Sequence, residues 1–260
     1  MLGKQVRLKR ITRKGKAVII PMDHGTSEGP IQGLENMENM IQKVEKGKAT
    51  SVLVHKGILQ NLKRVPNCGI IMHMSASTNM APDANNKVLI ASVQDAIRLG
   101  ADAVSVHVNI GGSEHETKML EILGNVSSEC IENQIPLLAM MYPRGKNIPQ
   151  IPDAKLISHI ARVGAELGAD LVKTIYTGDP KSFKQVVQGC PVPIVIAGGP
   201  KCATGKEVLE MVYDAMNAGA RGVSLGRTAF QHKNPIAMVK ALREIVIKNA
   251  EVKEAMELLE

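Results

Sequence analysis

The stretch AELGADLVKTIY (165–176) decides the fold, because it joins the end of a helix-like segment, a glycine turn and an apolar run. The same arrangement recurs in IRLGADAV (97–104) and MNAGARGV (216–223). A glycine that follows a helical segment and precedes an aliphatic run is typical of a helix that stops just before a buried strand. Its recurrence predicts a chain built from repeated helix–strand units.

Around this stretch, eight short apolar runs alternate with longer amphipathic segments. The runs are AVIIPM (17–22), SVLVH (51–55), GIIMHM (69–74), DAVSVHV (102–108), PLLAMMY (136–142), DLVKTIY (170–176), VPIVIAG (192–198) and GVSLG (222–226). The amphipathic segments lie near 34–47, 91–100, 114–133, 153–168, 180–188, 204–218 and 235–248. Runs that are apolar throughout are typical of parallel strands covered on both faces, so we predict an α/β fold, a single-domain (β/α)8 TIM barrel. A doubly wound open sheet is the alternative, although no G-x-G-x-x-G follows the first run.

The positive charge of the chain is concentrated at one end. The 260 residues contain 32 Lys and Arg against 25 Asp and Glu, which gives a net charge of +7. Residues 1–16 hold the whole excess and no acidic residue, so the rest of the chain is neutral. We predict a basic N-terminal arm over 1–16, a barrel catalytic domain over 17–250 and a C-terminal helical tail over 251–260.

Composition narrows the classes of partner and location. The chain has three Tyr, two Phe and no Trp, which argues against a platform that stacks bases, so we expect no nucleic-acid partner in spite of the basic arm. No apolar run approaches the length of a membrane span, so we expect no membrane partner. The four cysteines contain no C-x-x-C pair, which is typical of a reducing compartment, and a cytoplasmic location is expected.

Polar residues collect where the apolar runs end, which is where a barrel places its active site. Lys173 lies inside an apolar run, so its side chain must point into the barrel or disturb the packing. An unpaired buried charge is costly, so such a lysine tends to lose its proton, and a neutral amine beside a carbonyl forms a Schiff base. The alternatives are a lysine that extends to solvent or one paired with Asp170 or Asp179.

Two further residues end runs that would converge on the same mouth, namely Tyr142 and Asp23. A Schiff-base aldolase needs proton transfer at the carbinolamine and at the substrate hydroxyl, and a tyrosine and a carboxylate suit those transfers. Each residue could equally have a structural role, as a cap of the core or of the next loop.

The last two runs end in glycine clusters, IAGGP (196–200) and SLGR (224–227). Paired glycines let backbone N–H groups approach an anion, and barrels often bind phosphate after these two strands. Arg227 could add a charged fork. We therefore predict a phosphate site here.

Histidines also end four of the runs, which keeps a metal-dependent barrel as a second hypothesis. They are His24, His55, His73 and His107. None of them forms an H-x-H or H-E-x-x-H pair, and a histidine at the start of a loop is more often a hydrogen-bonding residue. GPKCATGKE (199–207) is not a Walker A loop, because five residues separate its glycines and Glu207 stands where Ser or Thr is required.

The chain resembles the class I (Schiff-base) aldolases of the archaeal fructose-bisphosphate aldolase and DeoC-like group, over about residues 4 to 250. Five motifs carry the resemblance in the expected order: PMDHG (21–25), MMYPRGK (140–146), VKTIYTGDP (172–180), IAGGPK (196–201) and GVSLGRTAFQH (222–232). Within the group it is most similar to the 2-amino-3,7-dideoxy-D-threo-hept-6-ulosonate synthases, although Ser224, Leu225 and Thr228 depart from the expected pattern near the phosphate.

The resemblance implies a role for each motif residue. It makes Lys173 the Schiff-base nucleophile, Tyr142 the proton donor and Asp23 the proton acceptor. It implies substrate contacts from His24, Gly25, Thr26, Ser27, Pro143 and Arg144, and phosphate contacts from Gly198, Gly199, Gly226 and Arg227. It implies no metal and no other cofactor, since the iminium itself is the electron sink.

The same resemblance implies the substrates. Lys173 would attack the methyl-ketone carbonyl of 6-deoxy-5-ketofructose 1-phosphate, and the resulting hydroxyacetone unit would pass to L-aspartate semialdehyde, in a route toward dehydroquinate and aromatic amino acids. The alternatives within the family are a fructose-bisphosphate aldolase and an aldolase that joins dihydroxyacetone phosphate to aspartate semialdehyde. The family also implies a ring-like homo-oligomer.

Overall fold

The computed structural model describes residues 2–149, 153–198 and 204–260. The barrel strands are β1 (Ala17–Pro21), β2 (Ser51–His55), β3 (Gly69–His73), β6 (Ala103–Ile110), β7 (Leu137–Pro143), β8 (Leu171–Thr174), β9 (Ile194–Ala197) and β10 (Gly222–Ser224). All pair in parallel and close in the order β1-β10-β9-β8-β7-β6-β3-β2. The single-domain (β/α)8 barrel is therefore confirmed, and each strand overlaps one of the eight apolar runs.

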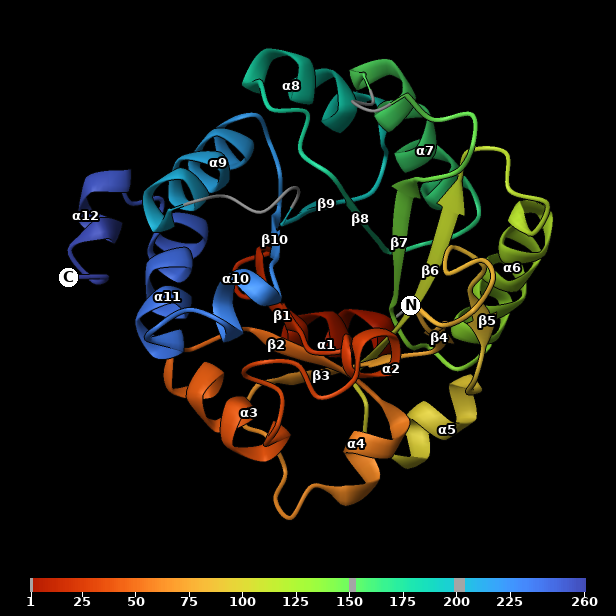
Figure 1. The fold of residues 1–260 in the computed structure, drawn as a ribbon, viewed down its shortest axis with the longest axis horizontal. Coiled ribbons are helices and arrows are strands. Elements are labelled where there is room, and N and C mark those ends of the chain that lie inside the picture. The colour runs from red at the N-terminus through yellow and green to blue at the C-terminus, as the bar shows by residue number, and fades with distance from the viewer. Residues whose placement is uncertain (1, 150–152, 199–203) are drawn as a thin grey trace.

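Helices form a ring outside the strands (Figure 1). They are α3 (Met37–Lys46), α4 (Lys56–Asn61), α5 (Val93–Arg98), α6 (Glu116–Glu132), α7 (Ala154–Glu166), α8 (Pro180–Gly189), α9 (Gly205–Asn217), α11 (Pro235–Arg243) and the π-helical turn η1 (Glu244–Lys248). Side-chain caps fix several starts, since Asp153 and Thr204 each accept a hydrogen bond from the backbone three residues on. No described helix is both long and apolar enough to span a bilayer.

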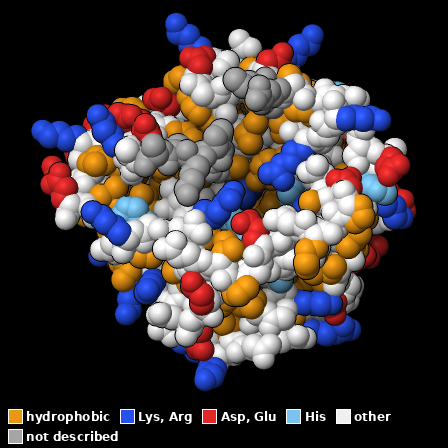
Figure 2. All heavy atoms as spheres, viewed as in Figure 1, with side chains coloured by type: hydrophobic (Ala, Val, Ile, Leu, Met, Phe, Trp, Pro, Cys, Tyr) orange, Lys and Arg blue, Asp and Glu red, His pale blue; other side chains and the backbone are white. Residues whose placement is uncertain are grey.

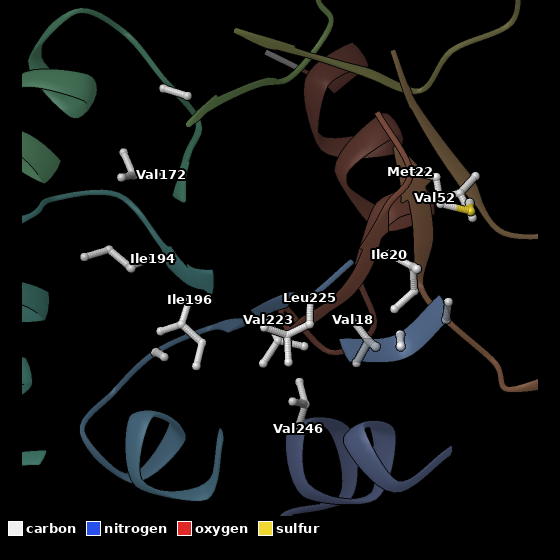
Figure 3. Close-up of a cluster of buried hydrophobic side chains, with 14 of the residues drawn as sticks. Val18, Ile20, Met22, Val52, Val172, Ile194, Ile196, Val223, Leu225 and Val246 are labelled. Atoms are coloured by element: carbon white, nitrogen blue, oxygen red, sulfur yellow. The ribbon is translucent and has the colours of Figure 1, made fainter. Parts of the chain in front are cut away.

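Side chains alternate along each strand and divide the core into two layers. The outer layer fills the space between strands and helices, where Val18, Val223 and Leu225 meet Val246 of η1 (Figure 3). The inner layer fills the barrel with residues such as Ile19, Leu53, Ile71, Leu138 and Leu171. This period of two fixes which residues at the strand ends face the barrel axis.

The basic N-terminal segment forms helix α1 (Leu2–Ile11), which closes the barrel at the amino-terminal ends of the strands. Ile11 is fully buried and belongs to the inner layer. Lys4 pairs with Asp170 at 2.8 Å, and Arg10 pairs with Asp102. A Cβ on Gly69 would lie 2.6 Å from the carbonyl oxygen of Arg10, so the helix fits closely against β3. We call this end of the barrel the floor.

Short elements occupy the opposite end, which we call the mouth. They are α2 (Gly25–Glu28), the antiparallel pair β4 (Ser75–Ala76) and β5 (Val88–Leu89), and α10 (Arg227–Phe230). The tail carries α12 (Val252–Met256), with Ala255 buried. The sequence did not predict α2, α4, α10 or the β4–β5 pair, and the division of the chain into arm, barrel and tail stays a prediction.

Candidate active site

The inner layer changes from apolar to polar toward the mouth. Below lie aliphatic side chains, and above them lie the inward positions of five strands or strand ends: Asp23, His55, His73, Tyr142 and Lys173. Figure 2 shows the mouth, where basic, acidic and histidine side chains surround a hollow. A polar, concave end of a barrel is where a substrate can reach reactive groups.

Lys173 lies in the middle of this layer. It stands beside Met140 of β7 and Val195 of β9, and only 7% of its surface is exposed. Its amine forms no hydrogen bond or ion pair with any residue in the described ranges. The two predicted alternative partners are engaged elsewhere, since Asp170 pairs with Lys4 and Asp179 caps α8. Its amine is therefore left available for chemistry.

Asp23 directly faces two histidines. Its carboxylate oxygens lie 3.7 Å from His24 Nδ1 and 3.7 Å from His73 Nε2, and its side chain is 20% exposed. Burial raises the pKa of this carboxyl, but the positive charges that His73, His24 and Lys173 carry when protonated outweigh burial and leave the pKa well below its ordinary value. Asp23 is therefore an ionised carboxylate that a substrate can still reach.

His73 is a neutral imidazole that is fixed from both sides. Its Nδ1 lies 2.7 Å from Ser105 Oγ, and His55 Nδ1 lies 3.2 Å from its backbone carbonyl. Burial is the largest influence and lowers the pKa of His73 to about 3, although Asp23 opposes the shift. The ring of His73 thus lies beside Asp23 as a neutral group, with Nε2 3.7 Å from the carboxylate and no hydrogen bond between them.

Tyr142 is held between two side chains of different charge. Its ring centroid lies 4.9 Å from that of His107, and the Arg144 guanidinium carbon lies 4.8 Å from it. His107 Nε2 contacts Asn109 Oδ1 at 2.8 Å, while Asn109 Nδ2 donates to the Asn85 carbonyl at 2.7 Å. Because the amide oxygen can only accept, His107 carries its proton on Nε2. Burial first, then Arg144, lowers the pKa of His107 well below its usual value.

The predicted substrate-contact residues lie in two loops at the mouth. Asp23 is followed by His24 and then by α2, which contains Gly25, Thr26 and Ser27. Ser27 Oγ donates to the Ser77 carbonyl at 3.0 Å, so α2 is tied to the segment that follows β3. In the second loop, Pro143 is the buried last residue of β7 and Arg144 is exposed.

The predicted phosphate-contact residues follow β9 and β10. A Cβ on Gly226 would lie 2.6 Å from the Pro21 carbonyl oxygen and 2.7 Å from His24 Cε1, so only glycine fits there. A Cβ on Gly198 would lie 3.6 Å from Leu225 Cδ2 and 3.7 Å from Thr228 Oγ1, which are ordinary van der Waals contacts, so a larger residue is not excluded there. Burial lowers the pKa of His24, and Arg227 adds to the shift, so this guanidinium lies near the site. Gly199 lies outside the described residues.

Sequence reasoning missed Ser105 and Lys87. Ser105 orients His73, and the signal for it was present, because polar residues at 105, 107 and 109 alternate within an otherwise apolar strand. Lys87 reaches Ser77 Oγ from the end of a loop, which no periodicity marks.

The described residues contain no ligand cluster of the kind that the metal hypothesis requires. Within the described parts of the chain, no three His, Cys, Asp or Glu side chains are grouped so that they could hold a metal ion. His73 and His107 each direct a ring nitrogen to a neighbouring side chain instead.

Comparisons with known proteins agree with this geometry. The 2-amino-3,7-dideoxy-D-threo-hept-6-ulosonate synthase 1 of Archaeoglobus fulgidus is 44% identical over 99% of this chain and 96% of its own length. The 2-amino-4,5-dihydroxy-6-oxo-7-(phosphonooxy)heptanoate synthase of Streptomyces griseus is 37% identical over 94% of this chain and 90% of its own length. A solved Schiff-base-forming fructose-1,6-bisphosphate aldolase superimposes with a TM-score of 0.87 at 30% identity, covering 94% of this chain and 99% of the other.

The family profile of the DeoC/LacD aldolases matches residues 17–232, which span every barrel strand. The matched range contains Asp23, Tyr142 and Lys173. The resemblance read from the five sequence motifs is thereby confirmed at the level of the family. The chain belongs to the DeoC/LacD family of aldolases.

Proposed function

We propose that the protein is a Schiff-base transaldolase that moves a hydroxyacetone unit from 6-deoxy-5-ketofructose 1-phosphate to L-aspartate semialdehyde. The product is 2-amino-3,7-dideoxy-D-threo-hept-6-ulosonate, the compound named in the A. fulgidus relative. One observation carries the proposal: Lys173 is buried and unpaired among the described residues, next to an ionised Asp23, in a barrel of an aldolase family.

Lys173 begins the reaction as the nucleophile. The nitrogen lone pair of its neutral amine attacks the methyl-ketone carbon, and the carbonyl oxygen takes up a proton to give a carbinolamine. Loss of water from the carbinolamine leaves an iminium bound to the lysine. The aliphatic layer below Lys173, including Leu171 and Met140, keeps bulk water away from this intermediate.

Tyr142 and Asp23 move the protons. Departure of the carbinolamine hydroxyl as water requires a donor, which we assign to Tyr142. Breaking the carbon–carbon bond requires removal of the proton from the hydroxyl on the departing fragment, which we assign to the carboxylate of Asp23. The bond electrons then flow into the iminium and form an enamine, and the departing fragment leaves as a three-carbon dicarbonyl phosphate.

The second half reverses these steps with a new partner. The enamine carbon attacks the aldehyde carbon of L-aspartate semialdehyde, and the aldehyde oxygen takes the proton that Asp23 or Tyr142 holds. Water then hydrolyses the new iminium, which frees the ketone product and restores the amine of Lys173. Protons balance over the cycle, and no oxidant or reductant is consumed.

We assign the phosphate of the donor to the end of β10. Gly226 packs closely against Pro21 and His24, which only a residue without a side chain allows, and Arg227 supplies positive charge beside it. Gly198 and Gly199, at the end of β9, belong to the same proposed site.

Borohydride trapping tests the lysine assignment. With a methyl ketone such as hydroxyacetone present, reduction should add the mass of the reduced adduct to the peptide that contains Lys173. Lys4 is a matched control, because it is equally buried but paired with Asp170, and it should stay unlabelled. An active enzyme whose Lys173 remains unlabelled would contradict the mechanism.

A product assay tests the substrates. Each candidate donor, including fructose 1,6-bisphosphate and dihydroxyacetone phosphate, is supplied with and without L-aspartate semialdehyde. We expect heptulosonate only from 6-deoxy-5-ketofructose 1-phosphate with the semialdehyde. Turnover of fructose 1,6-bisphosphate alone would favour a fructose-bisphosphate aldolase, and a phosphorylated product from dihydroxyacetone phosphate would favour the reaction named in the S. griseus relative.

The cytoplasmic location and the ring-like homo-oligomer stay predictions. Leu2 and Val6 on α1 are 76% and 55% exposed, which favours self-association through this helix. Sedimentation analysis of the protein with and without charge substitutions at both positions would test it.

A further inference from the structure

Lys87 and Arg144 are two cations at one side of the mouth that the proposed mechanism leaves without a role; we call them the basic pair. Lys87 immediately precedes β5, which pairs with β4 directly after β3. Arg144 follows β7 and lies over the ring of Tyr142 at 4.8 Å. In the barrel order, β7 and β3 lie on one side of β8, while β10 lies on the other side. The basic pair and Arg227 therefore flank Lys173 from different sides.

A set of hydrogen bonds fixes Lys87 toward the site. The Lys87 amine donates to Ser77 Oγ, and Ser77 Oγ donates to the Ala84 carbonyl at 2.7 Å. Two residues before Lys87, the Asn85 carbonyl accepts from Asn109. Asn109 is the register partner of Tyr142 in the neighbouring strand. The loop that carries Lys87 is thus tied to the strand pair that holds the proposed proton donor.

The two cations lie within electrostatic range of one another. Neither forms an ion pair with a carboxylate among the residues that the structure describes. Burial is the largest cause that lowers the pKa of Lys87, and repulsion from Arg144 lowers it further, while Asp23 and Asp83 raise it by less. Holding two like charges together costs free energy, and a bound anion would remove that cost.

We propose that the basic pair binds the anionic end group of the acceptor aldehyde, which is a carboxylate in the reaction proposed above. This inference rests on the proposed function and extends it to the recognition of the acceptor. The pair thereby selects aldehydes that carry an anionic group over neutral ones, while the site at β10 holds the phosphate of the donor.

The geometry of the addition step places the acceptor on this side. When the enamine attacks, the aldehyde oxygen gains negative charge and takes up the proton that Asp23 received in the cleavage step, so the aldehyde lies at the mouth beside Asp23, whose charge also acts on Lys87. In aspartate semialdehyde, three carbon–carbon bonds separate the aldehyde carbon from the carboxylate carbon. This short span lets the carboxylate reach the basic pair on the same side of the mouth, where the guanidinium of Arg144 lies over the ring of Tyr142.

Lys87→Met tests the proposal, with KM measured for acceptors of different charge. Loss of one charged hydrogen bond should raise KM for L-aspartate semialdehyde by about 10- to 100-fold. KM for propionaldehyde, a neutral acceptor, should change by less than about twofold. Lys87→Arg, which keeps the charge, should restore most of the affinity. Lys56→Met is the matched control, because Lys56 is partly buried, follows β2 and lies outside the basic pair.

Two further arms separate binding from loop structure. Ser77→Ala removes the hydroxyl that holds Lys87 but leaves its charge, so its effect on the semialdehyde KM should be smaller than that of Lys87→Met. An equal rise for charged and neutral acceptors in both variants would overturn the proposal. With glyceraldehyde 3-phosphate as acceptor, a similar rise supports anion recognition in general; a rise with this phosphate alone overturns the carboxylate assignment.

A trapping experiment separates this proposal from the proposed function. Hydroxyacetone carries no anionic group, so its borohydride adduct on Lys173 reports Schiff-base formation without the basic pair. No adduct in the wild type overturns both proposals. Suppose that the adduct forms in both the wild type and Lys87→Met, and that the ratio of KM for L-aspartate semialdehyde to KM for propionaldehyde is the same in both proteins. This result overturns the acceptor subsite and leaves the proposed function standing.

Discussion

The floor and the mouth of the barrel each bury a lysine to nearly the same extent, and they treat it in opposite ways. Lys4 at the floor is 6% exposed and donates to both oxygens of Asp170, at 3.0 and 2.8 Å. Lys173 at the mouth is 7% exposed and has no such partner among the described residues. A buried cation that is paired stabilises a helix position, whereas one that is left unpaired retains a reactive amine. The contrast separates a structural end of the barrel from a chemical end.

The largest expected effect is the difference in activity between Lys173→Met and Lys4→Met. Lys173→Met removes the proposed nucleophile, so kcat/KM should fall by more than about 10⁴-fold. Lys4→Met, at the same burial, should leave kcat/KM per folded molecule within about twofold. Steady-state assays of both variants check the contrast, and comparable losses in the two would remove the functional difference between floor and mouth.

Asp23→Asn should give the next largest loss. The amide cannot take the proton released when the carbon–carbon bond breaks, so kcat should fall by about 10²- to 10⁴-fold. Borohydride trapping on Lys173 should persist, because Schiff-base formation uses Tyr142 and the lysine. If trapping disappears together with turnover, Asp23 acts earlier than we assign it.

At the floor, the expected loss is in stability rather than rate. Among the residues with described positions, Lys4→Met leaves the carboxylate of Asp170 with the Leu137 N–H, at 2.9 Å, as its one hydrogen-bond partner. Breaking one side of a buried pair costs about 3–5 kcal/mol, and we expect about 2 kcal/mol here because Asp170 is 20% exposed. Urea unfolding measures the change. Lys9→Met on the exposed face of α1 is the control and should stay within about 0.5 kcal/mol.

The smallest expected effect is a dependence of stability on pH that belongs to the mouth. Burial lowers the pKa of His73 to about 3, while an unfolded histidine titrates near 6.5. Between those values the unfolded chain binds a proton that the folded chain does not, so the free energy of unfolding falls as pH falls. From pH 6.5 to 5.5 this histidine contributes a loss of about 1 kcal/mol.

Comparing urea unfolding of the wild type and His73→Gln at the two pH values checks this loss. The variant should lose about 1 kcal/mol less on acidification. His159→Gln changes an exposed histidine on α7 and is the control. Its free energy of unfolding should fall between the two pH values by the same amount as that of the wild type. A His73→Gln protein with the wild-type pH dependence would show that the mouth does not hold His73 neutral.

The floor and the mouth also differ in how far the sequence predicts them. Apolar runs set the barrel because each strand is covered on both faces, so its residues need no long-range information to be recognised. The inward lysine was also predictable, because a cation within the apolar run DLVKTIY must point into the barrel or disturb the packing. At the floor, the basic composition of residues 1–16 predicted an arm, and the structure has a helix there. Its cations pair with Asp102 and Asp170, which lie far along the chain and are not indicated by local sequence.

Loops at the mouth were the least predictable part. The β4–β5 pair has only two residues per strand, too few for a period-two pattern to appear. Lys87 acquires its position from Ser77, and the loop acquires its own from Asn109 and Ser27, none of which is implied by local spacing. Such residues are found only once the strands have brought distant segments together.

The pairing of Lys4 with Asp170 also sets an order of events during synthesis. The two residues are 166 positions apart, so at about 5–20 residues per second a ribosome produces the carboxylate roughly 8–33 s after the amine. During that time the first helix of the nascent chain has no barrel end to occupy. The seven cations and the absence of acidic residues in 1–16 keep this segment polar over that interval.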